Sequence, residues 1–159
     1  ATMLHGRLIS LMPYTQKRCH EFWRQYVPDP DMWDVVFSYN PGWVDRYYQS
    51  RTAEPDRRMF AICHLGETVG EIQLKRIDFG KGCATMSIHL ANDAHKNRGW
   101  GSEAERLITD YAFSALGLRT VYADCVHRNT RSQRVLEKTG FVFTHADGKL
   151  RYYVLNRPD

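Results

Sequence analysis

The chain has 159 residues, of which 43% are hydrophobic and 25% are charged, and this suits one globular domain over residues 1–159 with a sizeable core. No apolar run approaches the roughly 20 residues that a membrane helix needs, and no secretory signal is visible. The four scattered cysteines form no Cys-x-x-Cys pair, which argues against zinc or thiol-redox sites and favours a reducing, cytoplasmic location. The net charge is +4, and the surplus lies in residues 81–159, where twelve basic side chains outnumber eight acidic ones, as either a phosphate-binding or a nucleic-acid-binding face would require.

The first half of the chain is predicted to form one strand and two helical regions. A first strand is predicted over Leu4–Leu11. Pro13 and Thr15 then begin a helix that carries Cys19, Phe22, Trp23 and Tyr26. The Pro-Asp-Pro-Asp sequence at residues 28–31 ends that helix. A second helical region carries aromatic residues at 43–48 and ends at Pro55.

The second half alternates strands with two further helices. Strands are predicted at 59–65, 68–79, 83–90 and 120–126, helices at 101–116 and 130–139, and two final strands on either side of 146–149. Gly117 follows the first of these helices at the position where glycine commonly ends a helix. This order predicts an α/β (α+β) fold with a mixed, mostly antiparallel sheet flanked by helices.

Polar residues on two adjacent predicted strands share one face. Glu71, Gln73 and Lys75 alternate along the first strand, and His89 lies on the polar face of the next. Like faces meet only if paired residue numbers have an even sum, and a three-residue turn at 80–82 gives a sum of 162. This register predicts that Gln73 lies opposite His89 with Glu71 diagonally beside it, unless a bulge shifts the pairing.

The segment Lys96–Ser102, Lys-Asn-Arg-Gly-Trp-Gly-Ser, lies between a predicted strand and a predicted long helix. The first N–H groups of a helix are free and its dipole favours an anion there, so this position is suited to phosphate. Gly99 and Gly101 leave the backbone open, while Lys96 and Arg98 add positive charge. The segment has neither the Gly-Lys-Ser/Thr of a Walker loop nor the third glycine of a dinucleotide fingerprint, and an ordinary strand-to-helix turn would also explain two glycines.

Two motifs carry a resemblance to a known family. Lys96-x-x-Gly99-x-Gly101 resembles the pyrophosphate loop (Gln/Arg-x-x-Gly-x-Gly/Ala) of the GNAT N-acetyltransferases, with lysine in place of the usual Gln or Arg. The stretch Asn129–Phe141 resembles their second coenzyme A segment, and both motifs are similar to the RimJ/RimL branch of ribosomal-protein N-terminal acetyltransferases. The resemblance implies the GNAT fold, in which coenzyme A enters a splayed sheet. It also implies acetyl-CoA as co-substrate. The histidines show no metal-ligand spacing, so no metal is expected.

The resemblance implies coenzyme contacts at a strand end, in the pyrophosphate loop and in the second segment. These residues are Ile88, His89, Leu90, Lys96, Asn97, Arg98, Gly99, Trp100, Gly101, Ser102, Asn129, Ser132 and Arg134. For Asn129 the alternative is a helix N-cap, and for Arg134 it is an exposed helix arginine. Trp100 is expected to pack on the cofactor or on the sheet rather than to react.

Glu71 and His89 are the candidates for a general base, acting through water, although both could simply be polar residues of a partly solvated strand face. Many GNAT enzymes place a proton-donating tyrosine two residues before the lysine of the second motif, but Leu136 stands at that position. Ser132 is a candidate substitute, or else a coenzyme contact or a plain first-turn serine. A weakly supported base suits an α-amine, with a pKa of about 7.7–8.0, better than a lysine near 10.4.

Nine of the twenty aromatic residues fall between Phe22 and Tyr48, with Asp29, Asp31 and Asp34 interleaved, which suits either a cationic acceptor or a helix-face core. The function expected is acetyl transfer to a primary amine by direct attack, most simply a protein or peptide N-terminus. A small amine such as a polyamine or an amino-bearing antibiotic is the alternative, as is a coenzyme-binding module without useful catalysis. We expect no nucleic-acid or membrane partner, and a monomer or homodimer.

Overall fold

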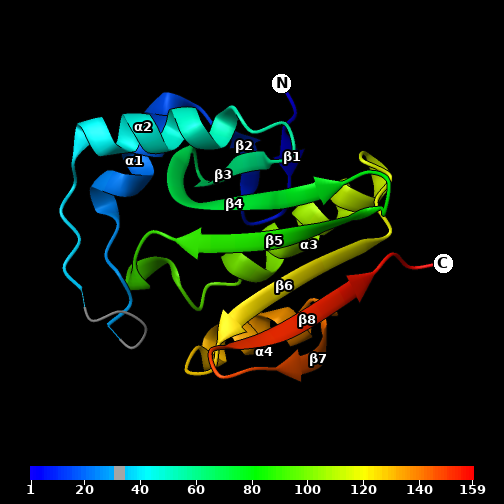
Figure 1. Ribbon diagram of the computed structural model, residues 1–159. Helices are drawn as coiled ribbons and strands as arrows, with labels where there is room; N and C mark the ends of the chain where they lie inside the picture. The colour runs from blue at the N-terminus through cyan, green and yellow to red at the C-terminus, as the bar shows by residue number, and fades with distance from the viewer. Residues whose placement is uncertain (31–34) are drawn as a thin grey trace.

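The computed structural model describes residues 1–30 and 35–159, which form one mixed sheet with helices on both faces (Figure 1). The eight strands lie in the order β1-β2-β3-β4-β5-β6-β8-β7, and the β5–β6 pair is parallel. The strands are β1 (Leu4–His5), β2 (Ser10–Pro13), β3 (Arg58–His64), β4 (Glu67–Asp78), β5 (Cys83–Leu90), β6 (Thr120–Val126), β7 (Val142–Ala146) and β8 (Leu150–Asn156). The helices are α1 (Gln16–Gln25), α2 (Pro41–Thr52), α3 (Trp100–Ser114) and α4 (Thr130–Lys138), with a 3-10 turn at Asp93–His95. This confirms the expected mixed, mostly antiparallel α/β fold.

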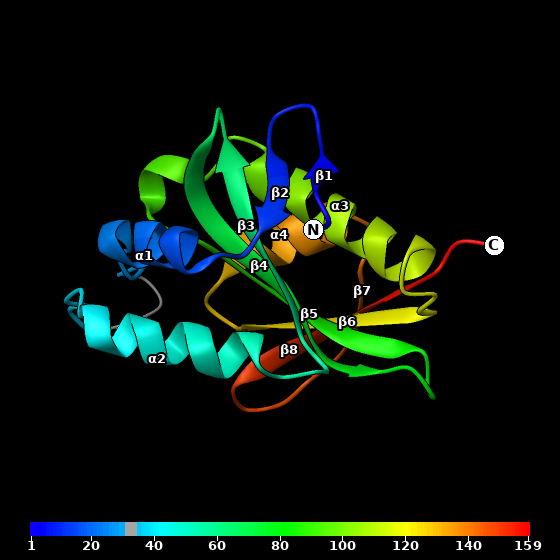
Figure 2. The ribbon, with the colours of Figure 1, turned by 90° about the horizontal axis from the view of Figure 1, so that it is seen from above.

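The helices divide between the two faces of the sheet, as the view from above shows (Figure 2). α1 and α2 cover one face, and α3 and α4 cover the other. None of the helices in the described part of the chain is both long and apolar enough to cross a membrane.

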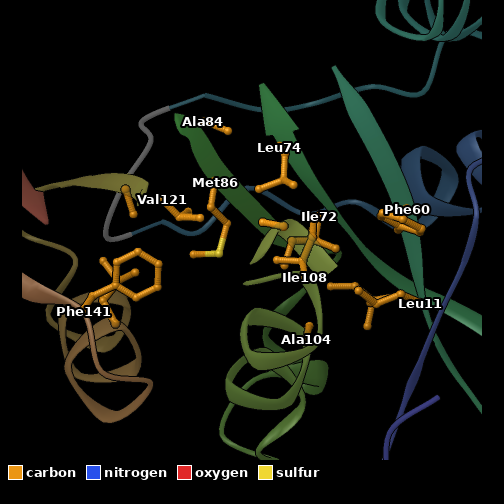
Figure 3. Packing of buried hydrophobic residues seen from close by; sticks show 14 of the residues in the cluster. Leu11, Phe60, Ile72, Leu74, Ala84, Met86, Ala104, Ile108, Val121 and Phe141 are labelled. Carbon is orange, nitrogen blue, oxygen red and sulfur yellow. The ribbon is translucent and has the colours of Figure 1, made fainter. Parts of the chain in front are cut away.

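The larger core lies between the sheet and α3. Figure 3 shows Ile72, Leu74 and Met86 of the sheet near Ala104 and Ile108 of the helix. All five side chains are buried, and their burial is the main favourable term that holds α3 against the strands. On the opposite face a smaller cluster joins α1 and α2 to β2 and β3, and its buried members are Tyr14, Cys19, Val44, Ala61 and Cys63.

The prediction of one strand over Leu4–Leu11 was wrong, because the chain reverses within it. β1 and β2 form an antiparallel hairpin in which Leu4 lies opposite Leu11. The N–H groups of Leu8 and Ile9 both donate to the Glu103 carboxylate of α3, at 2.7 and 2.9 Å. A distant helix therefore satisfies backbone groups that would otherwise continue the strand, and local sequence does not reveal such a partner.

The predicted register between β4 and β5 was also wrong, although the predicted faces meet. Glu71 lies directly opposite His89, and Gln73 lies opposite Ser87. The pairing shifts between Lys75 and Asp78, where Arg76 has a φ of 53°, so β4 carries a bulge before the turn. The paired numbers sum to 160 instead of 162, and like faces still match because both sums are even.

The sheet splays between β5 and β6. The two strands pair only over the three positions from Cys83↔Thr120 to Thr85↔Tyr122. Beyond this point no strand among residues 1–30 and 35–159 lies beside the gap-facing edge of β5, so alternate backbone N–H and C=O groups of its later residues point into the gap. This opening between β5 and β6 forms the floor of the candidate site.

Candidate functional site

Two hollows meet at the end of β5. The first, here called the β5–β6 cleft, has a volume of about 390 Å³ and lies between the splayed strands and the first turns of α3 and α4. The second, here called the aromatic cavity, has a volume of about 360 Å³ and lies between α1, α2 and the polar face of β4 and β5. Tyr26, Ser87 and His89 line both hollows, so the two hollows adjoin at these residues.

The β5–β6 cleft brings together seven of the residues expected to contact coenzyme A, namely Ile88, His89, Leu90, Lys96, Gly101, Asn129 and Ser132. Residues of the same set that lie outside its lining are Asn97, Arg98, Gly99, Trp100, Ser102 and Arg134. On α4, Arg131 lines the cleft while Arg134 is exposed away from it. Glu71 lies behind the cleft and lines the aromatic cavity with His89.

The first turn of α3 opens into the cleft. Gly99 is the N-cap with a φ of +80°, and no side chain of the described residues caps this helix. The first backbone N–H groups of the helix therefore lack an intrahelical or side-chain acceptor. A Cβ added at Gly101 would meet no atom within 4 Å, so this part of the backbone is open to a ligand.

Stacked rings hold the loop before α3 in place. The Trp100 ring is buried and stacks on His64 of β3, with ring centroids 4.5 Å apart. The Arg98 guanidinium lies over the same ring at 5.2 Å, and its Nε donates to the Ala94 carbonyl at 2.7 Å. Trp100 thus packs on the sheet, which is one of its two expected positions. Arg98 makes contacts within the loop itself, to the Trp100 ring and to the Ala94 carbonyl.

Lys96 joins the loop to the segment that follows α1. Its Nζ lies 3.1 Å from Asp29 Oδ2, and both side chains are mostly buried. Asp29 is one of three acidic residues that the sequence offers for binding a cationic acceptor, but its carboxylate lies against Lys96 of the phosphate loop instead. Asp31 and Asp34 lie outside the described residues.

The N-terminus of α4 forms the opposite wall of the cleft. The Asn129 side chain accepts from the Ser132 N–H at 3.0 Å, so it acts as the helix N-cap while also lining the cleft. Leu136 is buried in the same wall and lacks any proton to donate. Ser132 is a hydroxyl-bearing residue of this wall, beside Cys125, whose thiol pKa is raised by burial.

Glu71 is held by two phenols that sequence reasoning missed. Tyr14 Oη donates to Glu71 Oε2 at 2.5 Å, and Tyr47 Oη donates to Oε1 at 2.8 Å. The carboxylate is only 2% exposed. Burial and the neighbouring Glu71 charge raise the pKa of both phenols, which keeps them protonated as donors. No local pattern marks Tyr14 or Tyr47, because the three groups come from the β2–α1 connection, α2 and β4.

His89 stands between Glu71 and the meeting point of the two hollows. Its Nδ1 lies 3.9 Å from Glu71 Oε1, and its side chain is half exposed where the two hollows adjoin. Desolvation lowers the pKa of the imidazole, and the Glu71 charge opposes that shift. A lowered pKa leaves the ring neutral near pH 7, so it can accept a proton.

The aromatic cavity has one apolar wall and one polar wall. Trp23 lies at the centre of a group of rings whose centroids are 4.9 to 5.2 Å from its own, namely Phe22, Tyr26, Phe37, Trp43 and Tyr47. Four of these six rings line the cavity. The rings therefore serve both as a helix-face cluster and as the wall of a hollow. The polar wall carries Arg51, Arg57 and Lys75 besides Glu71. Within residues 1–30 and 35–159, no cluster of three or more His, Cys, Asp or Glu side chains is placed to hold a metal ion.

Comparison with known proteins agrees with this geometry. A family model described as an acetyltransferase (GNAT) domain matches residues 9–142. The chain belongs to the GNAT acetyltransferase family. The expected family is thus confirmed over most of the chain, including β2 to α4 and both walls of the β5–β6 cleft.

Among curated proteins, this GNAT chain is 34% identical over 106 residues to the Bacillus subtilis protein named "Probable N-acetyltransferase YjcK". The match covers 65% of this chain and 57% of that protein, so the chain spans little more than half the length of this relative.

Among solved structures, Mycobacterium smegmatis RimJ in complex with CoA-disulfide has a TM-score of 0.80 at 19% identity, covering 98% of this chain and 87% of RimJ. A spermidine N-acetyltransferase SpeG chimera from Vibrio cholerae and hSSAT has a TM-score of 0.79 at 15% identity, covering 94% and 96%. These two likenesses show a shared fold.

Proposed function

We propose that the chain is an acetyl-CoA-dependent N-acetyltransferase that acts on a primary amine. The observation that carries the proposal is a cleft between splayed strands, which has the uncapped N-terminus of α3 at its wall and opens onto His89. The pyrophosphate would lie against the backbone N–H groups near Gly101, where the helix dipole favours negative charge. The pantetheine arm would run along the unpaired edge of β5 toward His89.

The reaction requires one nucleophilic substitution at the thioester. The neutral amine nitrogen attacks the acetyl carbonyl carbon, the C–N bond forms, and the C–S bond then breaks to release the coenzyme A thiolate. Backbone N–H groups at the end of β5 would stabilise the developing oxyanion, and this kind of preorganised donor is a large part of catalysis. Both substrates bind together, and no covalent enzyme intermediate is needed.

Two proton movements complete the balance. His89 would accept the proton that the amine loses, directly or through a water, because its ring faces the junction of the two hollows. Glu71 would act as a positioning residue, since its buried carboxylate already accepts two phenol hydrogens. The thiolate would take a proton from Ser132 or from solvent, because Leu136 has none to give.

The acceptor that the site supports best is an α-amine at the N-terminus of a protein or peptide. A useful fraction of such an amine, with a pKa of about 7.7–8.0, is already neutral at pH 7, so one histidine is sufficient help. Two alternatives follow from other observations. The similarity to SpeG supports a small amine as the acceptor, and the leucine at position 136 supports a coenzyme-binding module without useful turnover.

An acetylation screen tests the proposal. The protein is incubated with acetyl-CoA and a panel of N-terminal peptides, polyamines and aminoglycosides, and thiol release and product mass are measured. Multiple turnovers with at least one amine are expected. Tight acetyl-CoA binding without turnover on any amine would identify a binding module instead.

A further inference from the structure

The polar wall of the aromatic cavity is graded in charge. Glu71, Gln73 and Lys75 follow one another along the same face of β4, and all three line the cavity. The separation of Glu71 and Lys75 along the strand is about 13 Å, from a rise of roughly 3.3 Å per residue. The cavity is therefore acidic at the end that meets His89 and basic at its far end.

The basic end has more positive charge than its own neighbours neutralise. Arg57 is paired with Glu54 at 2.9 Å and hydrogen-bonded to Gln73, while Arg51 lies over the Tyr47 ring at 5.0 Å. In the part of the chain that the structure describes, no carboxylate lies within ion-pair distance of Arg51 or Lys75.

Lys75 is half-buried among these cations. Desolvation and the charges of Arg76, Arg57 and Arg51 lower the pKa of its ammonium, and Asp124 is the acidic group that opposes them. An anion that entered the cavity would relieve this repulsion, whereas a polyamine would add to it.

We propose that the acceptor carries an anionic group several bonds away from its reacting amine, at the far end of the cavity, and that Lys75 with Arg51 recognises this group. This inference rests on the proposed acetyltransferase function and names its substrate class. An amine held beside His89 leaves about 13 Å along the strand to Lys75. The second or third residue of an extended peptide covers most of this distance at about 3.3–3.6 Å per residue, and its own acidic side chain together with the Lys75 side chain would span the rest. The anionic group is a carboxylate, either on an acidic side chain near the start of a peptide or on a small amine that bears a carboxyl group.

The acceptor chemistry is tested with matched peptides. Ala-Glu-Ala, Ala-Gln-Ala and Ala-Lys-Ala, all with amidated C-termini, are compared by kcat/KM at saturating acetyl-CoA. Unamidated Ala-Ala, whose only carboxylate is its C-terminus, separates a small carboxylated amine from an acidic side chain. The glutamate peptide is expected to exceed the glutamine peptide by about tenfold, since charge-assisted hydrogen bonds contribute at this level, and the lysine peptide should rank last.

Two variants assign the preference to the cavity. Lys75→Gln should reduce the glutamate-over-glutamine ratio to near one, and Lys75→Glu should favour the lysine peptide. Lys81→Gln, an exposed lysine in the β4–β5 turn, should keep the wild-type ratio. Equal rates for all three peptides would overturn the proposed specificity while leaving the transferase function intact.

Calorimetric binding of the same peptides to the protein with excess coenzyme A gives a readout that is independent of turnover. Tighter binding of the glutamate peptide that depends on Lys75 would support the inference even without transfer. Binding without charge preference would refute it.

Discussion

At the scale of single residues, Glu71 and His89 have different parts in one arrangement. They lie opposite each other on β4 and β5, but Glu71 is buried under two phenols whereas His89 is half exposed at the junction of the hollows. The Glu71 carboxylate already accepts one phenol hydrogen on each of its oxygens, whereas the imidazole is within reach of a ligand in the hollows. The imidazole is therefore the group that can exchange a proton with the acceptor.

His89→Gln should lower kcat by about 10²–10⁴-fold, which is the usual contribution of a general base. Below the lowered pKa of His89, wild-type log kcat/KM should fall with a slope of about two, because the imidazole and the acceptor amine are then both protonated. The variant should keep only the slope of about one that the amine causes. The measurement is a pH profile of kcat/KM between pH 5 and 9 on one peptide acceptor.

The matched control for this experiment is His145→Gln, at an exposed histidine of β7 that stacks on Tyr152 away from both hollows. Its profile should coincide with that of the wild type. An acid limb of unchanged slope in His89→Gln would mean that another group, or water alone, takes the proton.

The sequence could predict that Glu71 and His89 share a face, because strand parity depends only on alternation. It could not predict which residues lie opposite each other, since the bulge at Arg76 depends on a backbone φ of 53° that no motif marks. Nor could it find Tyr14 and Tyr47, whose phenols reach Glu71 from two other elements. Contacts between distant segments follow from the fold, and local pattern carries little information on them.

At the scale of elements, α3 and the loop before it were the most predictable part of the site. The glycine pattern, the preceding strand and the helical periodicity agreed, and the helix begins one residue before the predicted start. β1 and β2 were less predictable because Glu103 of α3 binds the backbone of the turn between them. The splay of β5 from β6 was expected only from the family resemblance.

Gly101→Glu should weaken acetyl-CoA binding by about 100-fold or more while leaving the fold intact. A Cβ at this position would meet no atom within 4 Å, so a side chain can leave the backbone here without a clash at its first atom. A carboxylate in the first turn even stabilises a helix through its dipole, by about 0.3–1 kcal/mol. In the β5–β6 cleft the same charge would repel the pyrophosphate.

The measurement is calorimetric titration with acetyl-CoA together with a thermal unfolding curve. Gly148→Glu, at a glycine with equally open space in the β7–β8 turn, is the matched control and should bind normally. Gly99 is a poorer test site, because its φ of +80° would add backbone strain to any effect on the ligand. If the folded Gly101→Glu protein bound acetyl-CoA with wild-type affinity, the pyrophosphate would have to bind somewhere other than this loop.

At the scale of the whole molecule, the sheet separates two cores, and the two hollows adjoin where the sheet splays. Apolar residues of one face of the sheet pack against α3, and those of the opposite face pack against α1 and α2. The splay between β5 and β6 leaves the end of β5 open. One buried acid in this arrangement has no part in the proposed reaction. Glu105 of α3 is 1% exposed, and its Oε1 accepts from Thr139 Oγ1, just after α4, at 3.0 Å.

Burial raises the pKa of Glu105 to about 8, and the hydrogen bond from Thr139 opposes this shift only in part. The unfolded chain would lose the same proton near its ordinary pKa of 4.5. Between these values the folded state binds more protons than the unfolded state, so the stability contributed by the neutral acid is lost as pH rises toward 8. The free energy of unfolding should therefore fall by on the order of 2 kcal/mol between pH 6 and pH 8 from this group alone.

Glu105→Gln keeps the shape of the side chain and removes its titration, so the variant should gain stability over the wild type as pH rises from 6 to 8. Urea unfolding at several pH values measures the difference, and Glu137→Gln, an exposed glutamate on α4, serves as the control whose curve should parallel that of the wild type. Because Glu105 links α3 to the end of α4, its ionisation would loosen the two helices that form walls of the coenzyme cleft. If the Glu105→Gln curve also ran parallel to the wild type, the carboxyl would have to be ionised in the folded protein already at pH 6, with a compensating cation or water beside it.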